Sequence, residues 1–488
     1  MPSFPRRLTA VLAPALLMAG AAATAPAAAA TAPAAAATSG AACPAPIIAA
    51  DTVLCGSLAD GATYLIEVPA HWNQTLFLYS HGYVIPGRDN PAEDVGDPVT
   101  GGWLLSHGYA LAGSSYSSTG WAIEQALPDQ VATLGVFADQ VGEPRHTVAW
   151  GHSLGGIITA GLIQRYPNRF SAALPMCGVL AGGVATWNTA LDGAFAFQQL
   201  VDPSVQITGI TNPLANLAGA KSAAAAAQAT PQGKARLALA AALGDTPGWF
   251  TSLSPEPAAN DFASQEANQF LWDDNVDFPF IFAFRAELEA RAGGNPSWNS
   301  GVNYVRQLAK SADQREVRAL YSAAGLSLGA DLQKLNNAAR VSADPSAVRY
   351  LARNISFTGK IGIPVLSIHT VGDGLVIPQN EQAYASVVRK AGRSFLLRQE
   401  FVSRAGHCAF TPAETITSVR SLLNRMRTGH WQDGALAPAS MNKGAAALGP
   451  AYNIFFSGGE VVPVAPAFAS FQPSRYPRPS DLSFMPRA

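Results

Sequence analysis

Short apolar segments that favour β-strands alternate with segments that favour helices along most of this chain, and this alternation limits the folds open to it. Strands are expected at 63–68, 75–79, 109–115, 147–150, 172–175, 364–369 and 395–401. Helices are expected at 101–106, 124–141, 156–165, 381–390 and 413–426. Strands that alternate with helices form a mostly parallel sheet. We therefore predict an α/β fold with a doubly wound, mostly parallel sheet.

The alternation is interrupted once, at 180–359, where the sequence favours helices. The clearer helical pieces of this interval are 217–243, 285–292 and 313–323. A chain of 488 residues also exceeds what one compact core usually holds. We expect 43–179 and 360–428 to form one sheet body in two parts, with 180–359 as an inserted helical cap. Residues 429–488, rich in Pro and Ala, are expected to form an extended tail packed on the body.

Residues 1–42 have the features of an export signal followed by a low-complexity segment. Arg6 and Arg7 precede an apolar run at 8–25, and small, Ala-rich cleavage sites follow. No later stretch offers the roughly 18 uninterrupted apolar residues of a membrane-spanning helix. We expect a signal peptide and a secreted mature chain with no membrane partner. The arginine pair leaves both the general secretory route and the twin-arginine route open.

The charge balance argues against nucleic acid as a partner. The chain has 32 Lys and Arg against 33 Asp and Glu, a formal net charge of -1, and no Lys/Arg-rich run. Proteins that bind phosphate backbones or anionic lipids carry clustered positive charge. A neutral or apolar substrate, either a small molecule or a polymer, fits this composition better. The sequence leaves the oligomeric state open.

Four cysteines follow the signal region: Cys43, Cys55, Cys177 and Cys408. An even number of cysteines in an exported chain favours disulfides, and no CxxC or HxxxH spacing favours a metal site instead. A bond between Cys43 and Cys55 would close a short N-terminal loop.

A serine-centred motif follows the expected strand at 147–150. Gly151-His152-Ser153-Leu154-Gly155 leads directly into the expected helix at 156–165. A nucleophile elbow needs an abrupt strand end, a serine in a strained turn, small residues two positions to either side, and a following helix. All four are present, so we predict that Ser153 is a nucleophile. The N-terminus of the following helix is suited to stabilise a developing oxyanion.

The same letters occur a second time, at Gly325-Leu326-Ser327-Leu328-Gly329, so the motif alone does not identify the site. No strand is expected before this second match, which lies between two helical stretches. We interpret Ser327 as part of a helix–helix turn.

The second donor of an oxyanion hole should follow an earlier strand. The expected strand at 75–79 runs into Ser80-His81-Gly82-Tyr83, so the backbone N–H groups of Tyr83 and Leu154 are the predicted donors. The similar Ser106-His107-Gly108-Tyr109 follows a helix instead. There Gly108 is expected to cap the helix and His107 to be structural.

With these motifs, 63–178 and 359–427 resemble the α/β-hydrolase superfamily and are most similar to its capped esterases, lipases and prolyl-type aminopeptidases. In that fold the acid follows the seventh strand and the histidine follows the eighth. The resemblance therefore implies Asp373 as the acid and His407 as the base, and the order Ser, Asp, His agrees.

In the mechanism that this resemblance implies, His407 takes the proton of Ser153 and Asp373 fixes the histidine tautomer. No metal or organic cofactor is required. If the His407 loop folds back over the sheet, Cys408 would approach Cys177 at the end of an earlier strand, and we hypothesise a disulfide between them. Tannase-like enzymes also place a cysteine beside the catalytic histidine. They have a second one beside the serine, where this chain has His152, and this departure argues against a close relationship.

Substrate choice depends on the expected cap. Its aromatic residues Trp249, Phe250, Trp272 and Phe278 are the first candidates to line an apolar pocket, and the same aromatic cluster includes Phe270, Phe280, Phe282 and Phe284. The cap's own core is the alternative for these rings. The acidic segment 273–277 is a candidate to hold a substrate ammonium, with a solvated loop as the alternative. We expect a carboxylic ester hydrolase for fairly hydrophobic substrates. An aminopeptidase is the main alternative, an inactive binding module is a remote one, and acyl transfer to an alcohol is not distinguished from hydrolysis.

Overall fold

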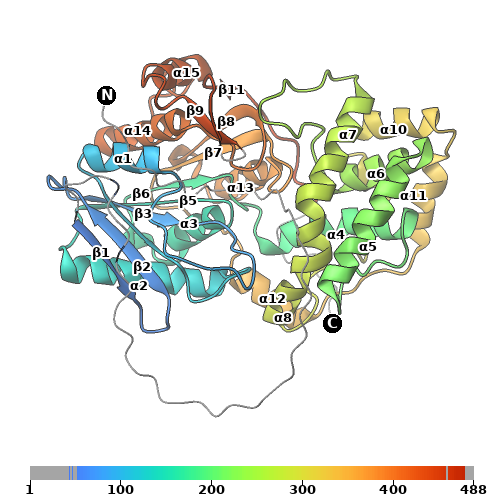
Figure 1. The fold of residues 1–488 in the computed structure, drawn as a ribbon, viewed down its shortest axis with the longest axis horizontal. Coiled ribbons are helices and arrows are strands. Elements are labelled where there is room, and N and C mark those ends of the chain that lie inside the picture. Colours follow the sequence, from blue (N-terminus) through green and yellow to red (C-terminus); the bar gives the residue numbers. More distant parts are fainter. Residues whose placement is uncertain (1–42, 44–46, 48–51, 458–459, 479–488) are drawn as a thin grey trace, which may run out of the picture.

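A nine-stranded sheet lies at the centre of the computed structural model, which describes residues 43, 47, 52–457 and 460–478 (Figure 1). Its strands follow the order β1 (Thr52–Ser57), β2 (Thr63–Val68), β4 (Ala110–Ser114), β3 (Thr75–Ser80), β5 (His146–His152), β6 (Ala172–Met176), β7 (Val365–Gly372), β8 (Leu397–Ala405) and β11 (Phe468–Ala469). The strands from β4 to β8 are parallel, and β1, β2 and β11 add antiparallel edges. The predicted α/β fold is confirmed. β1 was not among the expected strands.

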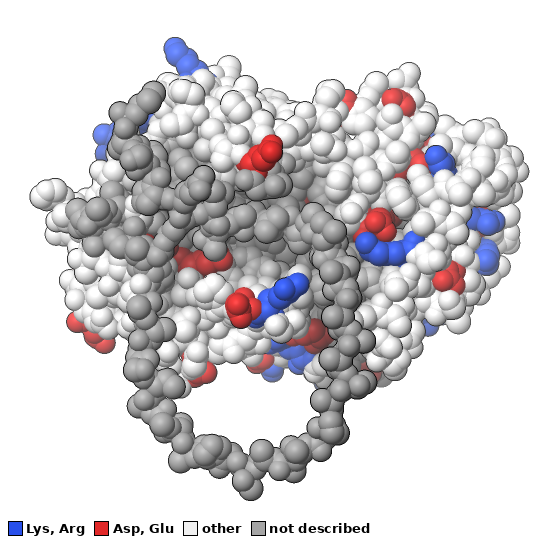
Figure 2. All heavy atoms as spheres, viewed as in Figure 1, with Lys and Arg blue, Asp and Glu red and all other residues white. Residues whose placement is uncertain are grey.

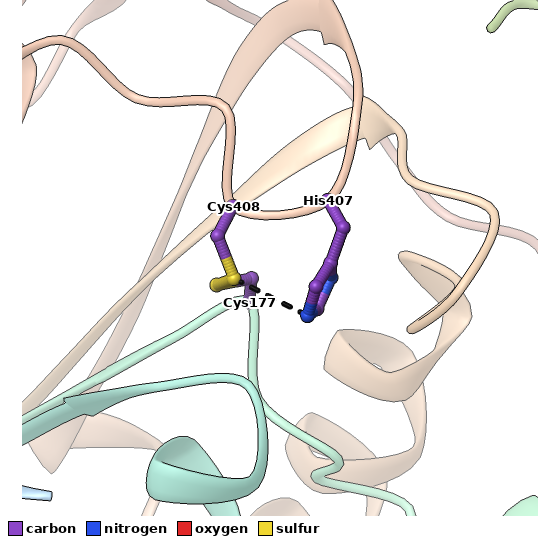
Figure 3. Close-up of side chains that lie close together, drawn as sticks. All are labelled: Cys177, His407 and Cys408. Carbon is purple, nitrogen blue, oxygen red and sulfur yellow. Dashed lines mark hydrogen bonds between the residues drawn. A yellow bond between two sulfur atoms is a disulfide. The ribbon is translucent and has the colours of Figure 1, made fainter. Parts of the chain in front are cut away.

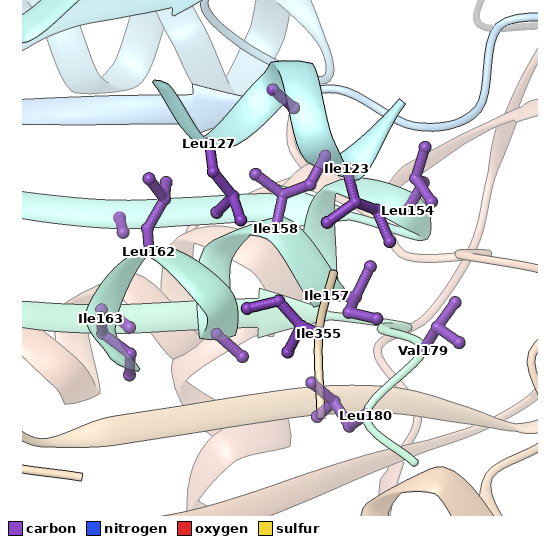
Figure 4. Packing of buried hydrophobic residues seen from close by; sticks show 14 of the residues in the cluster. Ile123, Leu127, Leu154, Ile157, Ile158, Leu162, Ile163, Val179, Leu180 and Ile355 are labelled. Atoms are coloured by element: carbon purple, nitrogen blue, oxygen red, sulfur yellow. The ribbon is translucent and has the colours of Figure 1, made fainter. Parts of the chain in front are cut away.

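Helices cover both faces of the sheet, and successive residues of one strand contact different layers. Phe77 of β3 packs with α1 (Pro98–Ser106), α14 (Pro412–Thr428) and α15 (Pro438–Ala446). Its neighbours Leu76 and Leu78 pack in the opposite layer. That layer contains α2 (Ile123–Gln140), α3 (Leu154–Arg165) and α13 (Gln379–Lys390). Figure 4 shows this second cluster, with side chains of α2 and α3 meeting above the sheet. A strand buried on both faces has a continuous apolar sequence, as β3 does.

The chain between β6 and β7 forms a helical cap beside the sheet (Figure 1). Its helices are α4 (Gly183–Leu200), α5 (Pro213–Gln228), α6 (Pro231–Gly244), α7 (Phe262–Trp272), α8 (Arg285–Ala292), α9 (Tyr304–Leu308), α10 (Gln314–Ala323), α11 (Leu328–Asn337) and α12 (Pro345–Arg353). The expected stretch 217–243 is two helices rather than one, because Thr230 caps a new helix that begins at Pro231. Two π-helical turns, Asp273–Asp277 and Phe280–Phe284, connect α7 to α8.

The C-terminal region is more structured than the extended tail expected at 429–488. It contains α15, a hairpin of β9 (Ile454–Ser457) and β10 (Glu460–Pro463), and β11, which pairs with β8. Pro438 stands in the first turn of α15, a position where proline does not interrupt a helix. Met441 and Phe468 are buried against the sheet body, so burial of a few apolar residues overrides the composition.

After β11 the chain leaves the sheet edge and contacts the cap. The Tyr476 hydroxyl lies 3.4 Å from Thr186 Oγ1 on α4. Arg478 forms an ion pair with Asp192, also on α4, at 2.9 and 3.0 Å, and donates to Trp298 O at 2.8 Å. The C-terminal segment therefore joins the outer edge of the sheet to the cap.

Replacing Arg478 by alanine should lower the free energy of unfolding by about 3 kcal/mol, because it leaves the buried Asp192 carboxylate without its cation. Arg475→Ala is the matched control, since Arg475 is exposed and should change stability little. Denaturant unfolding of both variants measures the difference. Equal midpoints for the two would show that the ion pair does not hold the segment to the cap.

The predicted signal peptide and low-complexity segment, 1–42, lie outside the described residues. Within the described ranges, no helix has both the length and the apolar character that crossing a membrane requires. Cys43 and Cys55 form the predicted disulfide, which ties Cys43 to β1.

Candidate active site

Ser153 occupies the turn between β5 and α3. Its backbone has φ 59° and ψ -121°, in the left-handed half of conformational space that non-glycine residues rarely adopt. The Ser153 N–H donates to Met176 O at 3.0 Å, and the Gly156 N–H donates to Ser153 O at 2.8 Å. These bonds hold the strained turn that the motif predicted.

The two glycines of the motif are required by the close approach of β3. A Cβ on Gly151 would lie 2.3 Å from Ser80 O, and one on Gly155 would lie 1.8 Å from the same oxygen. Both distances are far below a van der Waals contact, so any side chain at either position would push the end of β3 away. The glycines therefore allow Ser153 and the loop after β3 to lie together.

The loop after β3 lies beside Ser153. A Cβ built on Gly82 would be 3.5 Å from Ser153 Cβ. In the described part of the chain, no hydrogen bond uses the backbone N–H of Tyr83. Leu154 is the first residue of α3, where N–H groups lack a partner within the helix. The two predicted oxyanion donors thus belong to segments that meet at Ser153.

Two buried, stacked aromatic rings support this loop. The rings of His81 and Tyr116 lie 4.0 Å apart, and the Tyr116 hydroxyl donates to His81 O at 3.1 Å. Gln130 of α2 donates to Ser80 Oγ at 2.9 Å and to Tyr79 O. The sequence reasoning missed this support, because its residues come from three separated segments.

Asp373 and His407 meet beyond the ends of β7 and β8. His407 Nδ1 lies 2.8 Å from Asp373 Oδ2, and the Val376 N–H donates to Asp373 Oδ1 at 3.0 Å. A carboxylate only accepts, so Nδ1 of the neutral imidazole carries the proton and Nε2 is left without one. Burial alone would raise the pKa of Asp373, but the charges and hydrogen bonds of His407 and His369 outweigh it and lower the pKa. The carboxylate is therefore ionised.

The predicted disulfide between Cys177 and Cys408 is present, and it lies against His407. Figure 3 shows Cys177 reaching the His407 loop from the segment after β6, with the Cys408 sulfur 3.4 Å from His407 Nε2. The two sulfurs are bonded to each other, so this cluster offers no thiolate to a metal ion. Among the described residues no hydrogen bond joins Ser153 Oγ to His407, and such bonds often tighten only in substrate complexes.

His152, next to Ser153, is a neutral side chain. Burial, followed by the charge of His407, lowers its pKa to about 4. Its Nδ1 lies 3.1 Å from the Tyr79 hydroxyl. His152 therefore adds no charge beside Ser153 at neutral pH.

Three of the four predicted substrate-binding aromatics lie near the Asp373 loop. A Cβ on Gly374 would lie 2.3 Å from the Trp272 ring, and the Trp272 ring nitrogen donates to Trp249 O at 2.9 Å. Phe250 packs edge-on against Trp272 at 5.1 Å between centroids. Phe278 is different, because it packs with Phe197 and Phe282 in the core of the cap. The prediction for Phe278 is thus corrected: the need to bury the cap's own core accounts for it.

Two other rings of the predicted aromatic cluster of the cap lie beside the loop that follows β3. Phe280 and Phe284 approach the Tyr83 ring with centroid distances of 5.1 and 6.0 Å. They project from a π-helical turn, a feature common at functional sites. The alternation of phenylalanines in 278–284 was visible in the sequence, but it did not show which rings face the body.

The acidic segment 273–277 is not the solvated loop considered as its alternative. Asp273 and Asp277 are each 8% exposed. Burial, then Glu266 and Asp274, raises the pKa of Asp273 to about 8. Burial also raises the pKa of Asp277, and the negative charges of Asp273 and Asp373 add to this effect.

Ser327 and His107, which stand in the second occurrences of the two motifs, have the structural roles expected. Ser327 caps α11 by accepting from the Ala330 N–H at 3.2 Å. His107 ends α1 and stacks on Trp103 at 4.1 Å.

No family model matches the chain. A curated relative, the o-phthalyl amidase of Xanthobacter agilis, is 27% identical over 415 residues, which cover 77% of this chain and 87% of the relative. A ligand-bound structure of the rice cell wall degrading esterase LipA from Xanthomonas oryzae is 13% identical with a TM-score of 0.36, and the match covers 77% of this chain and 90% of the esterase. Acylaminoacyl peptidase from Pyrococcus horikoshii is 9% identical with a TM-score of 0.33, over 73% of this chain.

The chain spans only 37% of the length of that peptidase.

The fold itself is recognised from three features of this chain: the order of its strands, the helices on both faces of the sheet, and the serine elbow between β5 and α3. The chain therefore has an α/β-hydrolase fold, with a helical cap between β6 and β7.

Proposed function

We propose that the protein is a serine hydrolase that cleaves carboxylic esters of apolar acids through an acyl-enzyme on Ser153. The observation that carries this proposal is the strained Ser153 turn, together with the ionised Asp373 bonded to His407 at the same end of the sheet. The curated relative is named as an amidase, and amidases are hydrolases too.

In the proposed reaction, Ser153 Oγ attacks the carbonyl carbon while His407 Nε2 takes its proton. Asp373 holds the Nδ1–H and stabilises the imidazolium that forms. The backbone N–H groups of Tyr83 and Leu154 receive the oxyanion, and the N-terminus of α3 adds a favourable dipole. His407 then protonates the leaving alcohol, and water releases the acid by the same steps.

The aromatic wall of Tyr83, Phe280 and Phe284 supports an apolar or aryl acyl group. On the face drawn in Figure 2, the described acidic and basic residues are scattered among uncharged ones, some of them next to a residue of opposite charge, and form no large patch of one sign. This distribution supports an uncharged substrate over a polyanion.

Amide cleavage is the second candidate, favoured by the relative's name, o-phthalyl amidase. The same residues serve it, with the difference that His407 must protonate an amine as it leaves. An aromatic acyl group would again lie against Phe280 and Phe284.

Purified protein should hydrolyse p-nitrophenyl benzoate with kcat/KM about tenfold above that for the acetate, because the aryl group buries apolar surface against the cap rings. Phe280→Ala should remove most of this preference while acetate turnover persists. The matched benzoyl and o-phthalyl anilides, and aminoacyl anilides, are measured beside them. Turnover of anilides alone would replace the ester proposal by the amidase. A requirement for a free α-amino group would favour an aminopeptidase instead.

We also propose that the chain is exported. Two disulfides support an oxidising compartment, and the sequence at 1–42 supports a cleaved signal. Sequencing the N-terminus of protein recovered from the culture medium tests this. Recovery only from the cytosol, with residues 1–42 intact, would overturn it.

A further inference from the structure

Asp373 has a second histidine partner. His369, on β7, places Nε2 3.5 Å from Asp373 Oδ2 and 2.7 Å from Val376 O. Its Nδ1 lies 3.1 Å from Glu381 Oε1 on α13. The side chains of His369, Asp373 and Glu381 are all fully buried. A continuous chain of contacts therefore runs from Glu381 through His369 and Asp373 to His407.

The surroundings of His369 favour its doubly protonated form. Both ring nitrogens face oxygen atoms, and a carbonyl or an ionised carboxylate only accepts. The other oxygen of Glu381 accepts from Ser367 Oγ at 2.5 Å and from the Gln399 side chain. Burial alone would lower the pKa of His369, but the hydrogen bonds and charges of Asp373 and Glu381 outweigh it and raise the pKa to about 10.

We propose that His369 and Glu381 are positioning residues of this hydrolase, with His369 held as an imidazolium by Glu381 and keeping Asp373 ionised and oriented toward His407. This inference rests on the proposed function. Neither residue touches a reacting atom, so each acts through Asp373.

A cation beside Asp373 offsets the effect of burial on its carboxylate. Asp373 is fully buried, and its burial favours the neutral acid. In the resting enzyme His407 must be neutral to act as a base, so it cannot then supply the positive charge. His369 supplies that charge at every stage of the reaction.

The other titratable groups around this chain of contacts come from several elements. α13 contributes Tyr384, whose pKa is raised by burial and by Glu381. β5 contributes His152, which interacts with His407 and is neutral at neutral pH. In the described part of the chain, His407 and His369 are the positive groups that interact with Asp373.

The sign of the pH effect follows from the charge. A cation beside the Asp373–His407 pair lowers the pH at which the pair loses its shared proton. Without that cation the pair keeps the proton up to a higher pH, and the active form becomes populated only at that higher pH. The acid limb of kcat/KM should therefore move upward when His369 loses its charge.

His369→Gln tests this directly. A glutamine amide can still donate to Val376 O but carries no charge, so it keeps the local structure and removes the imidazolium. We expect kcat to fall by about tenfold, KM to stay within about twofold, and the acid limb of kcat/KM to rise by about one pH unit. Glu381→Gln should move the acid limb in the same direction. Glu400→Gln is the control, because Glu400 is buried on β8 but interacts with neither His369 nor Asp373.

The variants are compared with Ser153→Ala in the same assay, and circular dichroism checks their folding. If Ser153→Ala is inactive while His369→Gln keeps the wild-type kcat and acid limb, the inference is wrong and the proposed function stands. A fall in kcat with an unmoved acid limb would show a structural role only and would also overturn it. If His369→Gln does not fold, Glu381→Gln decides by the same criteria. Activity retained by Ser153→Ala would overturn the proposed function itself.

Discussion

Ser153→Ala should lower kcat for the best ester substrate by about 10⁴- to 10⁶-fold. In the proposed mechanism Ser153 Oγ forms the bond to the acyl group, and the neighbouring His152, which is half-buried, is bonded to Tyr79 rather than free to replace it. Alanine adopts the same backbone as serine and removes only the hydroxyl, so the fold should persist. The measurement is steady-state turnover of p-nitrophenyl esters, with the melting temperature as a check on folding.

Ser327→Ala is the matched control for this variant, because it changes the same residue in the same five-letter pattern. Ser327 caps α11, so its loss should cost about 1 kcal/mol of stability and leave turnover unchanged. The opposite result, with activity retained at Ser153→Ala and lost at Ser327→Ala, would show that the wrong serine was assigned.

Most of the serine turn could be predicted because its requirements are local in sequence. The end of β5, the two glycines and the start of α3 lie within a few residues, and the contacts of Gly151 and Gly155 with Ser80 explain why no other residue fits. Asp373 and His407 lie more than 200 residues further along, beyond the cap. Their assignment needed the strand order of a known fold, and the 2.8 Å contact between them agrees with it.

The remaining features depend on tertiary packing that no local pattern encodes. Phe278 and Phe280 are two residues apart, yet the first fills the cap core and the second faces Tyr83. The contact of His369 with Glu381 joins β7 to α13, and neither residue stands in a motif that marks it. β11 is two residues long, too short for its pairing with β8 to be expected from the sequence.

Removing the Cys177–Cys408 disulfide, by replacing both cysteines with alanine, should lower the free energy of unfolding by about 5 kcal/mol. The bond closes a loop of 231 residues that contains the whole cap, and the entropy that a cross-link removes from the unfolded chain grows with loop length. The Cys43–Cys55 pair closes a loop of 12 residues, so the corresponding double variant should lose about 3 kcal/mol. Denaturant unfolding of the two double variants gives the comparison.

The same pair of variants separates stability from catalysis. Cys408 follows His407 directly and its sulfur lies 3.4 Å from His407 Nε2, so loss of the disulfide frees the loop that carries His407, the proposed base. Because misplacement of a catalytic group by about 1 Å can cost about a hundredfold, kcat should fall by about ten- to a hundredfold at temperatures where the variant remains folded. The Cys43–Cys55 variant should keep the wild-type kcat. If the two variants lose stability but both keep full kcat, the disulfide only restrains the unfolded chain, and the position of His407 is set by its bond to Asp373 alone.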